Sequence, residues 1–373
     1  MKYVALKDVC KINMGQSPDS SSYNENGEGI PFFQGNADFG ERYPVTRVWC
    51  NAPTKIAQSE DILISVRAPI GALNYAKEKC CIGRGLAAIT PDKSKVSLEF
   101  VYWFLKGKNA ELKSKGTGST FKAISKKILE EILIPDVGFD KQHEYAQMLE
   151  KIYVIIQTRK QGLQKLDELI QSRFVELFGN PISNSYGLPE ATLPELGEFG
   201  RGVSKHRPRN DPRLLDGEYP LIQTGDIANT DLYITLYNST YSELGLQQSK
   251  MWNKGTLCIT IAANIAKTAI LRFDACFPDS VVGFNANERT NNIFIHYWFS
   301  FFQSILESQA PESAQKNINL KILSELKVIV PKKEKQDEFV EFINQLDKSK
   351  SKIQKSLEET QRLFDSLMQK YFG

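Results

Sequence analysis

The chain has 373 residues, 41% of them hydrophobic and 24% charged, which is typical of a globular protein with two or three domains. Its net charge of +3 is close to balance, so composition alone gives no sign of nucleic-acid binding. The longest apolar run, Ile295–Phe302, is far shorter than the roughly 18 residues that a membrane-spanning helix requires, so no such helix is predicted. Six cysteines without metal-ligand spacing, and the lack of a signal-peptide pattern, predict buried free thiols in a cytoplasmic protein.

Residues 1–136 are predicted to form a first globular domain. It contains short β-rich runs bounded by turn residues, which are typical of strands. A helix is predicted at Leu98–Leu105, and its aromatic residues are expected in the core rather than stacked on bases. The predicted strands are Ile30–Phe33, Asp61–Val66, Ile132–Pro135 and one entered through glycines within Cys81–Ile89.

Residues 137–179 are predicted to form a long helix, and this helix has a second copy at residues 332–373. Lys141 to Gly179 and Lys335 to Gly373 both open with Lys-Gln-x-Glu-aromatic and end with Phe-Gly. The offset is 194 residues at both ends, so the copies align without a gap. The terminal glycines are suited to helix C-caps.

Residues 180–331 repeat the order of the first domain. Tyr219–Asp226 echoes Ile30–Asn36, and Tyr297-Trp-Phe299 echoes Tyr102-Trp-Phe104. The order is globule, helix, globule, helix. This predicts a mixed α/β (α+β) fold with a pseudo-two-fold internal repeat, in which two globular domains are joined by two long antiparallel coiled-coil helices.

Apolar residues in both helices recur at alternating steps of three and four, which predicts a seam between them. Polar residues that interrupt the seam, such as Arg159 and Lys350, are expected to extend out of it. The alternative is two unrelated amphipathic helices, each packed on its own domain. The predicted seam residues are Leu149, Ile152, Ile156, Leu163, Leu166, Ile170, Ile343, Leu346, Ile353, Leu357, Phe364 and Leu367.

Catalytic and metal-binding signatures are missing from the sequence. There is no phosphate-binding loop, no zinc-type spacing and no amino-methyltransferase motif, so neither a catalytic residue nor a metal ligand is predicted. His143, at the entrance of the first long helix, is expected at the surface. Pro91-Asp92 with Glu111-Leu-Lys113 has the order of a PD-(D/E)xK nuclease, but the second segment continues a helical run. Positions i and i+2 diverge on a helix, which argues against the nuclease.

Polar loop residues recur at equivalent places in both domains and have the chemistry that DNA recognition uses. Arg and Lys can bridge guanine edges, Gln and Asn can bridge adenine edges, and Lys, Ser and Thr can hold phosphates. In the first domain the candidates are Gln34, Asn36, Arg67, Arg84, Thr117, Ser119 and Lys122. In the second they are Lys205, Arg207, Arg209, Gln223, Thr224, Asn264, Lys267, Lys316 and Asn317.

The chain resembles the specificity subunit of type I restriction-modification enzymes along its whole length. The resemblance rests on Ile64–Gly71, on Cys81–Ile89 and on the Pro…Lys-Gln-x-Glu entrance to each long helix. In the second globule, Ile261–Ala266 and Phe277–Ser280 replace the arginine-bearing motifs, which implies that the two halves read different sequences.

The resemblance implies two target-recognition domains that each read half of a split, asymmetric site in double-stranded DNA. It also implies no catalysis by this chain. Two methyltransferase (modification) subunits and the restriction/translocase subunits would be its partners, and S-adenosylmethionine, ATP and Mg²⁺ would be bound by those partners. The outer faces of the helices would dock the methyltransferase subunits.

The predicted helix length supports a spacing role. A helix of about 35 residues spans on the order of 50 Å, which exceeds one turn of DNA. Two other hypotheses remain: a helical scaffold protein that does not bind DNA, and a stand-alone nuclease. Salt-sensitive retention of DNA would discriminate against the scaffold, and incubation with Mg²⁺ and plasmid would test the nuclease.

Overall fold

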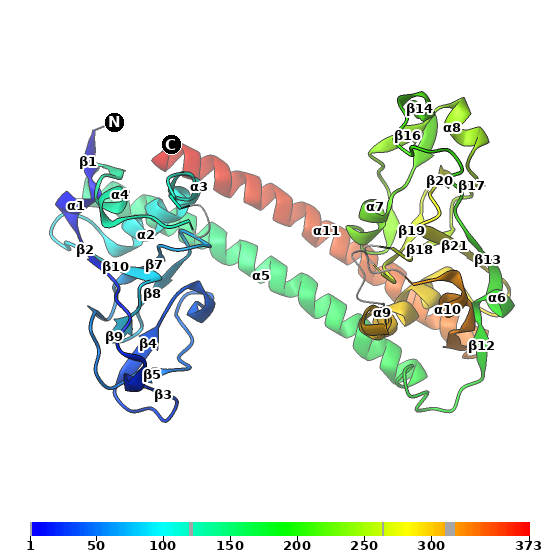
Figure 1. Cartoon of the computed structure of the whole chain (residues 1–373), viewed down its shortest axis with the longest axis horizontal. Helices are drawn as coiled ribbons and strands as arrows, with labels where there is room; N and C mark the ends of the chain where they lie inside the picture. Colours follow the sequence, from blue (N-terminus) through cyan, green and yellow to red (C-terminus); the bar gives the residue numbers. More distant parts are fainter. Residues whose placement is uncertain (1, 119–121, 263–264, 310–317) are drawn as a thin grey trace. The chain divides into compact units, whose positions relative to one another are not determined.

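The structure is a computed structural model that describes residues 2–118, 122–262, 265–309 and 318–373. The chain divides into two compact units. Unit 1 consists of Met1–Gln161 and Gln354–Gly373, and unit 2 of Gly162–Ile353. The two long helices, α5 (Phe139–Phe178) and α11 (Lys333–Phe372), each contribute one end to each unit (Figure 1).

The long helices keep the predicted repeat. Each has 40 residues, and both their first and last residues differ by the offset of 194. Gly179 ends α5 with φ of +74°, a left-handed conformation that favours glycine. Its amide donates to the Val175 carbonyl at 2.8 Å, so the predicted C-cap is confirmed.

A buried glutamine explains the repeated Lys-Gln-x-Glu motif. Gln142 is 3% exposed, donates to the Val137 carbonyl at 2.8 Å and accepts from the Ser97 amide at 2.8 Å. Gln336, at the same place in the second copy, is fully buried and donates to the Pro331 carbonyl at 2.9 Å. These bonds satisfy buried polar groups and fix the direction in which each helix leaves its globule.

Unit 1 contains a four-stranded sheet in the order β2-β10-β7-β8 and a five-stranded sheet in the order β3-β5-β4-β9-β6, while β1 pairs with β11. In the first sheet β10 is antiparallel to both its neighbours, and in the second β4 is parallel to β9. The strands are β1 Tyr3–Ala5, β2 Cys10–Met14, β3 Tyr23–Asn24, β4 Ile30–Phe33, β5 Trp49–Cys50, β6 Ile56–Ala57, β7 Ile62–Ser65, β8 Leu73–Tyr75, β9 Cys80–Ile82, β10 Leu86–Pro91 and β11 Leu133–Pro135. The shorter helices are α1 Leu6–Val9, η1 Ser20–Ser22, η2 Asn36–Asp38, α2 Leu98–Gly107, α3 Asn109–Ser114 and α4 Lys126–Glu130.

The core of unit 1 lies around α2. As predicted, the aromatic residues of α2 are buried, and Phe100, Trp103 and Phe104 have no exposed surface. They share one apolar cluster with Ile64 of the sheet and with Leu149 of α5. Burial of this surface accounts for the attachment of the globule to the long helices.

Unit 2 repeats this plan. Its five-stranded sheet has the order β13-β21-β18-β19-β15 and its four-stranded sheet the order β16-β14-β20-β17, while β12 pairs with β22. The strands are β12 Glu190–Thr192, β13 Gly197–Arg201, β14 Leu215–Leu221, β15 Tyr233–Ile234, β16 Ser239–Tyr241, β17 Met251–Trp252, β18 Leu257–Thr260, β19 Thr268–Leu271, β20 Ala275–Cys276, β21 Val281–Ala286 and β22 Lys327–Ile329. The shorter helices are α6 Leu193–Leu196, η3 Pro212–Leu214, α7 Thr224–Ala228, α8 Glu243–Gln247, α9 Asn292–Gln309 and α10 Leu320–Glu325.

Two local predictions need correction. The run Cys81–Ile89 is divided between β9 and β10, because the glycines at 83 and 85 form a turn between the two strands. The aromatic echo in the second half is out by one residue. The caps Ser97 and Asn291 lie 194 residues apart, and each side chain accepts from the amide three residues later. Tyr297 therefore corresponds to Trp103 and not to Tyr102.

The helices pair in an antiparallel manner within each unit. In unit 1 the rings of Tyr145 and Tyr371 stack with centroids 3.9 Å apart, so the start of α5 meets the end of α11. In unit 2 Phe174 and Phe339 lie 5.4 Å apart, so the end of α5 meets the start of α11. Unrelated, separately packed helices are therefore excluded. Among the predicted seam residues, Leu149, Ile152, Ile156, Ile170, Ile343 and Phe364 are buried, and Leu163, Leu166, Leu346, Ile353, Leu357 and Leu367 are half-buried.

The polar interruptions of the seam do not extend outward as predicted. In unit 1, Arg159 donates to the carbonyl of Ser356 across the helix pair at 2.9 Å. In unit 2, the ammonium of Lys350 lies 2.6 Å from a carboxylate oxygen of Asp167. Partners across the seam offset the cost of desolvating these cations, and such polar pairs can fix the register of two helices.

Candidate nucleic-acid interface

The predicted DNA contacts of unit 1 begin at a turn directly after strand β4. We call residues 34–38 the first glutamine turn. The amide of Gln34 donates to a carboxylate oxygen of Asp38 at 2.7 Å, which satisfies the backbone and leaves the glutamine side chain exposed. Asn36 lies within the same turn and is half-buried.

This turn forms one wall of a cleft of about 510 Å³, the first cleft, which is lined by Gln34, Asn36 and Arg67 among others. Backbone hydrogen bonds bring these segments together, because Gly85 donates to the Gln34 carbonyl at 3.2 Å and accepts from the Val66 amide at 2.9 Å. A Cβ at position 85 would lie 2.3 Å from the Gln34 oxygen. The close approach therefore requires glycine at this position.

Further predicted residues lie on neighbouring backbone segments. Arg67 forms a β-bridge with Ala123, which also pairs with Thr117 through hydrogen bonds of 2.9 and 3.0 Å. The Lys122 carbonyl accepts from the Ala68 amide at 3.2 Å. Arg67, Thr117 and Lys122 are all exposed.

Arg84 is exposed on the turn between β9 and β10, with Gly85 as its neighbour in the first cleft. The Arg84 amide lies 3.3 Å from the hydroxyl of Ser17, which accepts its hydrogen. Ser119, also predicted in this set, lies outside the described residues. Of the described candidates of unit 1, Gln34, Asn36 and Arg67 line the first cleft, while Arg84, Thr117 and Lys122 do not.

Unit 2 has a counterpart, the second glutamine turn (residues 223–226), which begins two residues after the end of β14. The amide of Gln223 donates to Asp226 at 2.8 Å, and its side-chain amide lies 3.3 Å from the hydroxyl of Ser239. Gln223, Thr224 and Arg209 line a second cleft of about 280 Å³. In unit 2, as in unit 1, three predicted residues therefore line the cleft at the glutamine turn.

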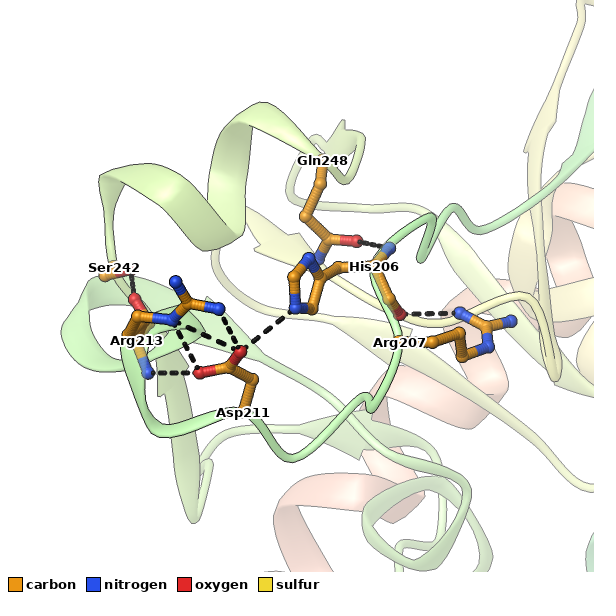
Figure 2. A network of polar contacts seen from close by, with 6 residues as sticks. All are labelled: His206, Arg207, Asp211, Arg213, Ser242 and Gln248. Carbon is orange, nitrogen blue, oxygen red and sulfur yellow. Dashed lines mark hydrogen bonds and ion pairs between the residues drawn. The ribbon is translucent and has the colours of Figure 1, made fainter.

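The basic run of unit 2 is held by acidic and amide side chains (Figure 2). The carboxylate of Asp211 accepts from Arg213 at 2.7 Å and lies 3.0 Å from His206 Nε2. These hydrogen bonds, from Arg213 first, hold the pKa of Asp211 well below its usual range. Gln248 Oε1 accepts from the amide of Lys205 at 2.7 Å. The run is therefore an ordered segment.

Two arginines of this run share one carboxylate. Arg207 Nη2 lies 3.4 Å from Asp279 Oδ2, and Arg209 pairs with the other oxygen of Asp279. The Arg207 and Arg209 side chains are nevertheless about half exposed, at 55% and 47%. Arg209 lines the second cleft, whereas Arg207 is not among its lining residues.

The structure does not bring every predicted residue of unit 2 to this cleft. Lys267 is half-buried in the turn between β18 and β19, and its ammonium donates to Gln303 of α9 at 3.2 Å. It is not among the residues that line the second cleft. Asn264, Lys316 and Asn317 lie outside the described residues. Their roles stay predictions.

Sequence reasoning missed the acidic residues that shape both clefts. Asp38 and Asp226 hold the two glutamine turns, and Asp279 holds the arginines of unit 2. The sequence does contain a signal for Asp38 and Asp226. Each of these aspartates follows its glutamine by three or four residues, which is the spacing of a capped turn. No local pattern connects Asp279 with arginines 70 and 72 residues earlier.

Other chemistry has little support in the described parts of the chain. Among these residues no group of three or more His, Cys, Asp or Glu side chains could hold a metal ion. In the nuclease-like pattern, Glu111 lies on α3 as predicted, and its carboxylate pairs with Lys115 of the same helical run at 2.6 Å.

All six cysteines are free and buried, which confirms the prediction of buried free thiols. His143 is exposed, also as predicted. No helix within the described residues is long and apolar enough to cross a membrane.

The model of the type I restriction modification DNA specificity domain matches residues 1–168 and 190–360. The chain belongs to this family. The two matched regions correspond to the two copies of the internal repeat, so the family match covers both globules and most of both long helices.

Curated relatives carry the same description. The chain is 46% identical over 158 residues to the putative type I restriction enzyme MjaX specificity subunit of Methanocaldococcus jannaschii. This match covers 42% of the chain but only 37% of the length of that relative. The chain is also 21% identical over 409 residues to the type I restriction enzyme EcoBI specificity subunit of Escherichia coli. This second match covers 99% of the chain and 85% of the relative.

Solved structures show the same fold. The S subunit of a type I restriction-modification system from M. genitalium superposes with a TM-score of 0.63 at 17% identity, over 100% of this chain and 96% of the other. A chain from a study of complex assembly and conformational transition of the type I R-M system has a TM-score of 0.56 at 16% identity, with 100% and 97% coverage.

Proposed function

We propose that this chain is the DNA sequence-recognition subunit of a type I restriction-modification complex, in which each globule reads one half of a bipartite, asymmetric site. The observation that carries the proposal is the recurrence of a glutamine turn beside an arginine-lined cleft in both units. The family match supports the same role. The target-recognition domains we propose are residues 1–136 and 180–331, with spacer helices at 137–179 and 332–373.

The chemistry of the clefts suits direct reading of bases. Exposed glutamine side chains such as Gln34 and Gln223 can form paired hydrogen bonds with adenine, and the arginines can form them with guanine. Thr117, Lys122 and Lys205 are exposed and suit phosphate contacts. Backbone pairing places Thr117 and Lys122 beside the segment of Arg67, and Lys205 belongs to the basic run of unit 2. Because the two sets differ, the two half-sites are expected to differ in sequence.

Catalysis is assigned to other polypeptides. Two methyltransferase subunits would bind S-adenosylmethionine, and restriction/translocase subunits would use ATP and Mg²⁺ to move along and cut DNA. This chain would determine which DNA sequence the complex binds. The outer faces of its long helices would be the docking surfaces for the methyltransferase subunits. The complex would work in the cytoplasm, where its DNA is.

The long helices are proposed to set the gap between half-sites. Each is uninterrupted over 40 residues, which is about 60 Å at 1.5 Å per residue. Insertion of seven residues, two helical turns, after Gln161 of α5 and a matching seven after Lys352 of α11 is expected to lengthen the unspecified gap and keep both half-sequences. A methylated motif of unchanged spacing would contradict this role.

Methylation-aware sequencing of DNA from cells that express the chain with its partner subunits tests the main proposal. A bipartite methylated motif is expected, and Arg67→Met should relax the half-site read by unit 1 alone. Exchange of residues 1–136 with those of a relative should likewise change one half-site. Absence of any motif, together with no salt-sensitive DNA retention, would favour the scaffold hypothesis instead.

A further inference from the structure

The loop that follows the first glutamine turn is tied to helix α5. This loop runs from Asp38 to Val48, and both of these residues line the first cleft. In the middle of the loop, the guanidinium of Arg42 pairs with Glu150 of α5. The Arg42 side chain is only 20% exposed, whereas that of Glu150 is 44% exposed, so the cation is the shielded member of the pair.

Aromatic rings complete the attachment of Arg42. Its guanidinium carbon lies 5.3 Å from the ring centroid of Tyr102, 5.4 Å from that of Trp103 and 4.8 Å from that of Tyr153. Cation–π attraction adds to the ion pair, and the rings shield the guanidinium from water. The Arg42 carbonyl also accepts from the Tyr75 amide at 2.8 Å, which fixes the loop to strand β8.

Unit 2 ties its own loop to the helix pair with the charges reversed. Asp231 follows the second glutamine turn by five residues, and one of its carboxylate oxygens lies 2.6 Å from the ammonium of Lys350 on α11. Lys350 is 16% exposed and also lies 2.6 Å from Asp167 of α5. Here the loop supplies the carboxylate and the helix supplies the cation, whereas in unit 1 the loop supplies the cation.

The two ion pairs meet equivalent residues of the shorter helices α2 and α9, although on the long helices Glu150 corresponds to position 344 and not to Lys350. Lys350 sits in a pocket lined by His296 and Tyr297 of α9, and by the repeat offset these residues correspond to Tyr102 and Trp103, which hold Arg42. The contact with these helix residues therefore recurs, while the charges of loop and long helix are exchanged. Recurrence with exchanged charges indicates that the connection between loop and helix is the common feature.

The cost of breaking such a connection explains how it could position a turn. Removal of the shielded cation detaches the loop from the long helix, because the ion pair and the contacts of the cation are lost together, while the carboxylate, 44% exposed in Glu150 and 80% in Asp231, stays hydrated. In unit 1 that loop begins at Asp38, the residue that holds the Gln34 amide. A displaced loop would therefore alter the placement of the glutamine side chain in the cleft.

We propose that Arg42 and Lys350 are positioning residues, each of which sets the base selectivity of its own unit by holding the glutamine turn against the helix pair, without itself contacting DNA. The inference rests on the proposed function, and it assigns a role to two residues that lie outside both clefts. It predicts that each ion pair governs one half-site only.

The test measures methylation by the whole complex, with partner subunits, on two libraries in which one half-site at a time is randomised. Arg42→Met is expected to lower selectivity about 10-fold in the half-site read by unit 1 and to leave the other half unchanged. Lys350→Met is expected to lower selectivity in the half-site read by unit 2 and to leave the half-site of unit 1 unchanged. Arg42→Lys keeps a cation for Glu150 and should restore most of the selectivity.

Matched controls separate positioning from general loss of stability. Arg173→Met removes an ion pair with Glu338 across the same helices but away from the glutamine turns, and it should leave both half-sites unchanged. If Arg42→Met fails to fold, Glu150→Gln removes the same ion pair at nearly constant volume and should give the same result. Melting temperature is recorded for every variant.

Three outcomes decide the matter. Loss of selectivity confined to one half-site, with rescue by Arg42→Lys, supports the proposal. Unchanged selectivity, or an equal loss in both halves that follows the melting temperature, overturns it while the proposed function stands. A wild-type complex without any sequence preference overturns the proposed function itself, and the positioning role with it.

Discussion

The two units share their internal framework and differ in how they bring positive charge to their clefts. In unit 1, Arg84 itself stands on the turn between β9 and β10. In unit 2, the equivalent turn carries Asp279, which gathers Arg207 and Arg209 from a different loop. The buried contacts are therefore retained between the two copies, while the exposed positive charges come from different loops in the two units.

The largest expected effect comes from the shared framework. Gln142→Ala and Gln336→Ala each remove a buried side chain that satisfies backbone groups, and each should lower the free energy of unfolding by about 2–3 kcal/mol. Calorimetry of the whole chain, with the thermal transition of each unit resolved, should show the loss in the unit that contains the variant. Gln164→Ala, on an exposed stretch of α5, serves as the control. Equal shifts of both transitions would contradict independent frameworks.

A pH titration should separate the units next. In unit 2, burial lowers the pKa of His296 to about 4 from an ordinary value of 6.5. Between these values the unfolded chain binds the proton and the folded chain does not, so stability should fall as pH drops from 6.5 to 4, by at most about 3 kcal/mol. His296→Gln should flatten this acid limb in urea unfolding curves; a limb that persists would contradict the assignment.

Unit 1 should respond at alkaline pH instead. Burial, with the nearby charge of Arg42, lowers the pKa of Lys106 to about 8 from 10.5. The unfolded chain holds this proton up to a higher pH, so unit 1 should gain stability as pH rises from 8 to 10.5, again by at most about 3 kcal/mol. Lys106→Met should remove the gain. The expected result is stability that rises with pH in both units, but in an acid window for unit 2 and an alkaline window for unit 1.

The smallest expected effect concerns the charge at the second cleft. Asp279→Asn releases Arg207 and Arg209 from their shared carboxylate and should tighten non-specific DNA binding about three- to tenfold, with a salt slope steeper by about 0.9. Binding is measured by anisotropy of a fluorescent duplex across a salt series, with partner subunits present.

Glu198→Gln is the matched control for this change. It removes the same charge from an exposed pair with Lys250 in the same unit, away from the lining of the cleft. If the control tightens binding as much as Asp279→Asn, the effect is one of net charge rather than of released arginines, and the comparison of the clefts loses its basis.

Local patterns were sufficient to predict most of the framework. Strands such as β4 and β7, the burial of the α2 aromatics and the two long helices follow from hydrophobic periodicity and turn residues, which act over a few positions. The candidate clefts were partly predictable, because Gln34 and Gln223 follow equivalent strands, β4 and β14, whereas Arg67 and Arg209 come from loops that are not equivalent. The strand boundary at Gly83 was missed, since a turn between apolar runs has the same composition as a strand entered through glycines.

The sequence by itself determined the repeat, the order of the elements and the seam of the helix pair, because these depend on spacing along the chain. Only the tertiary structure decided which charges meet. Arg42 finds Glu150 at a separation of 108 residues, and Lys350 finds Asp231 at 119. A charge has no periodicity that indicates its partner, so these ion pairs form only when the folded chain brings distant loops and helices together.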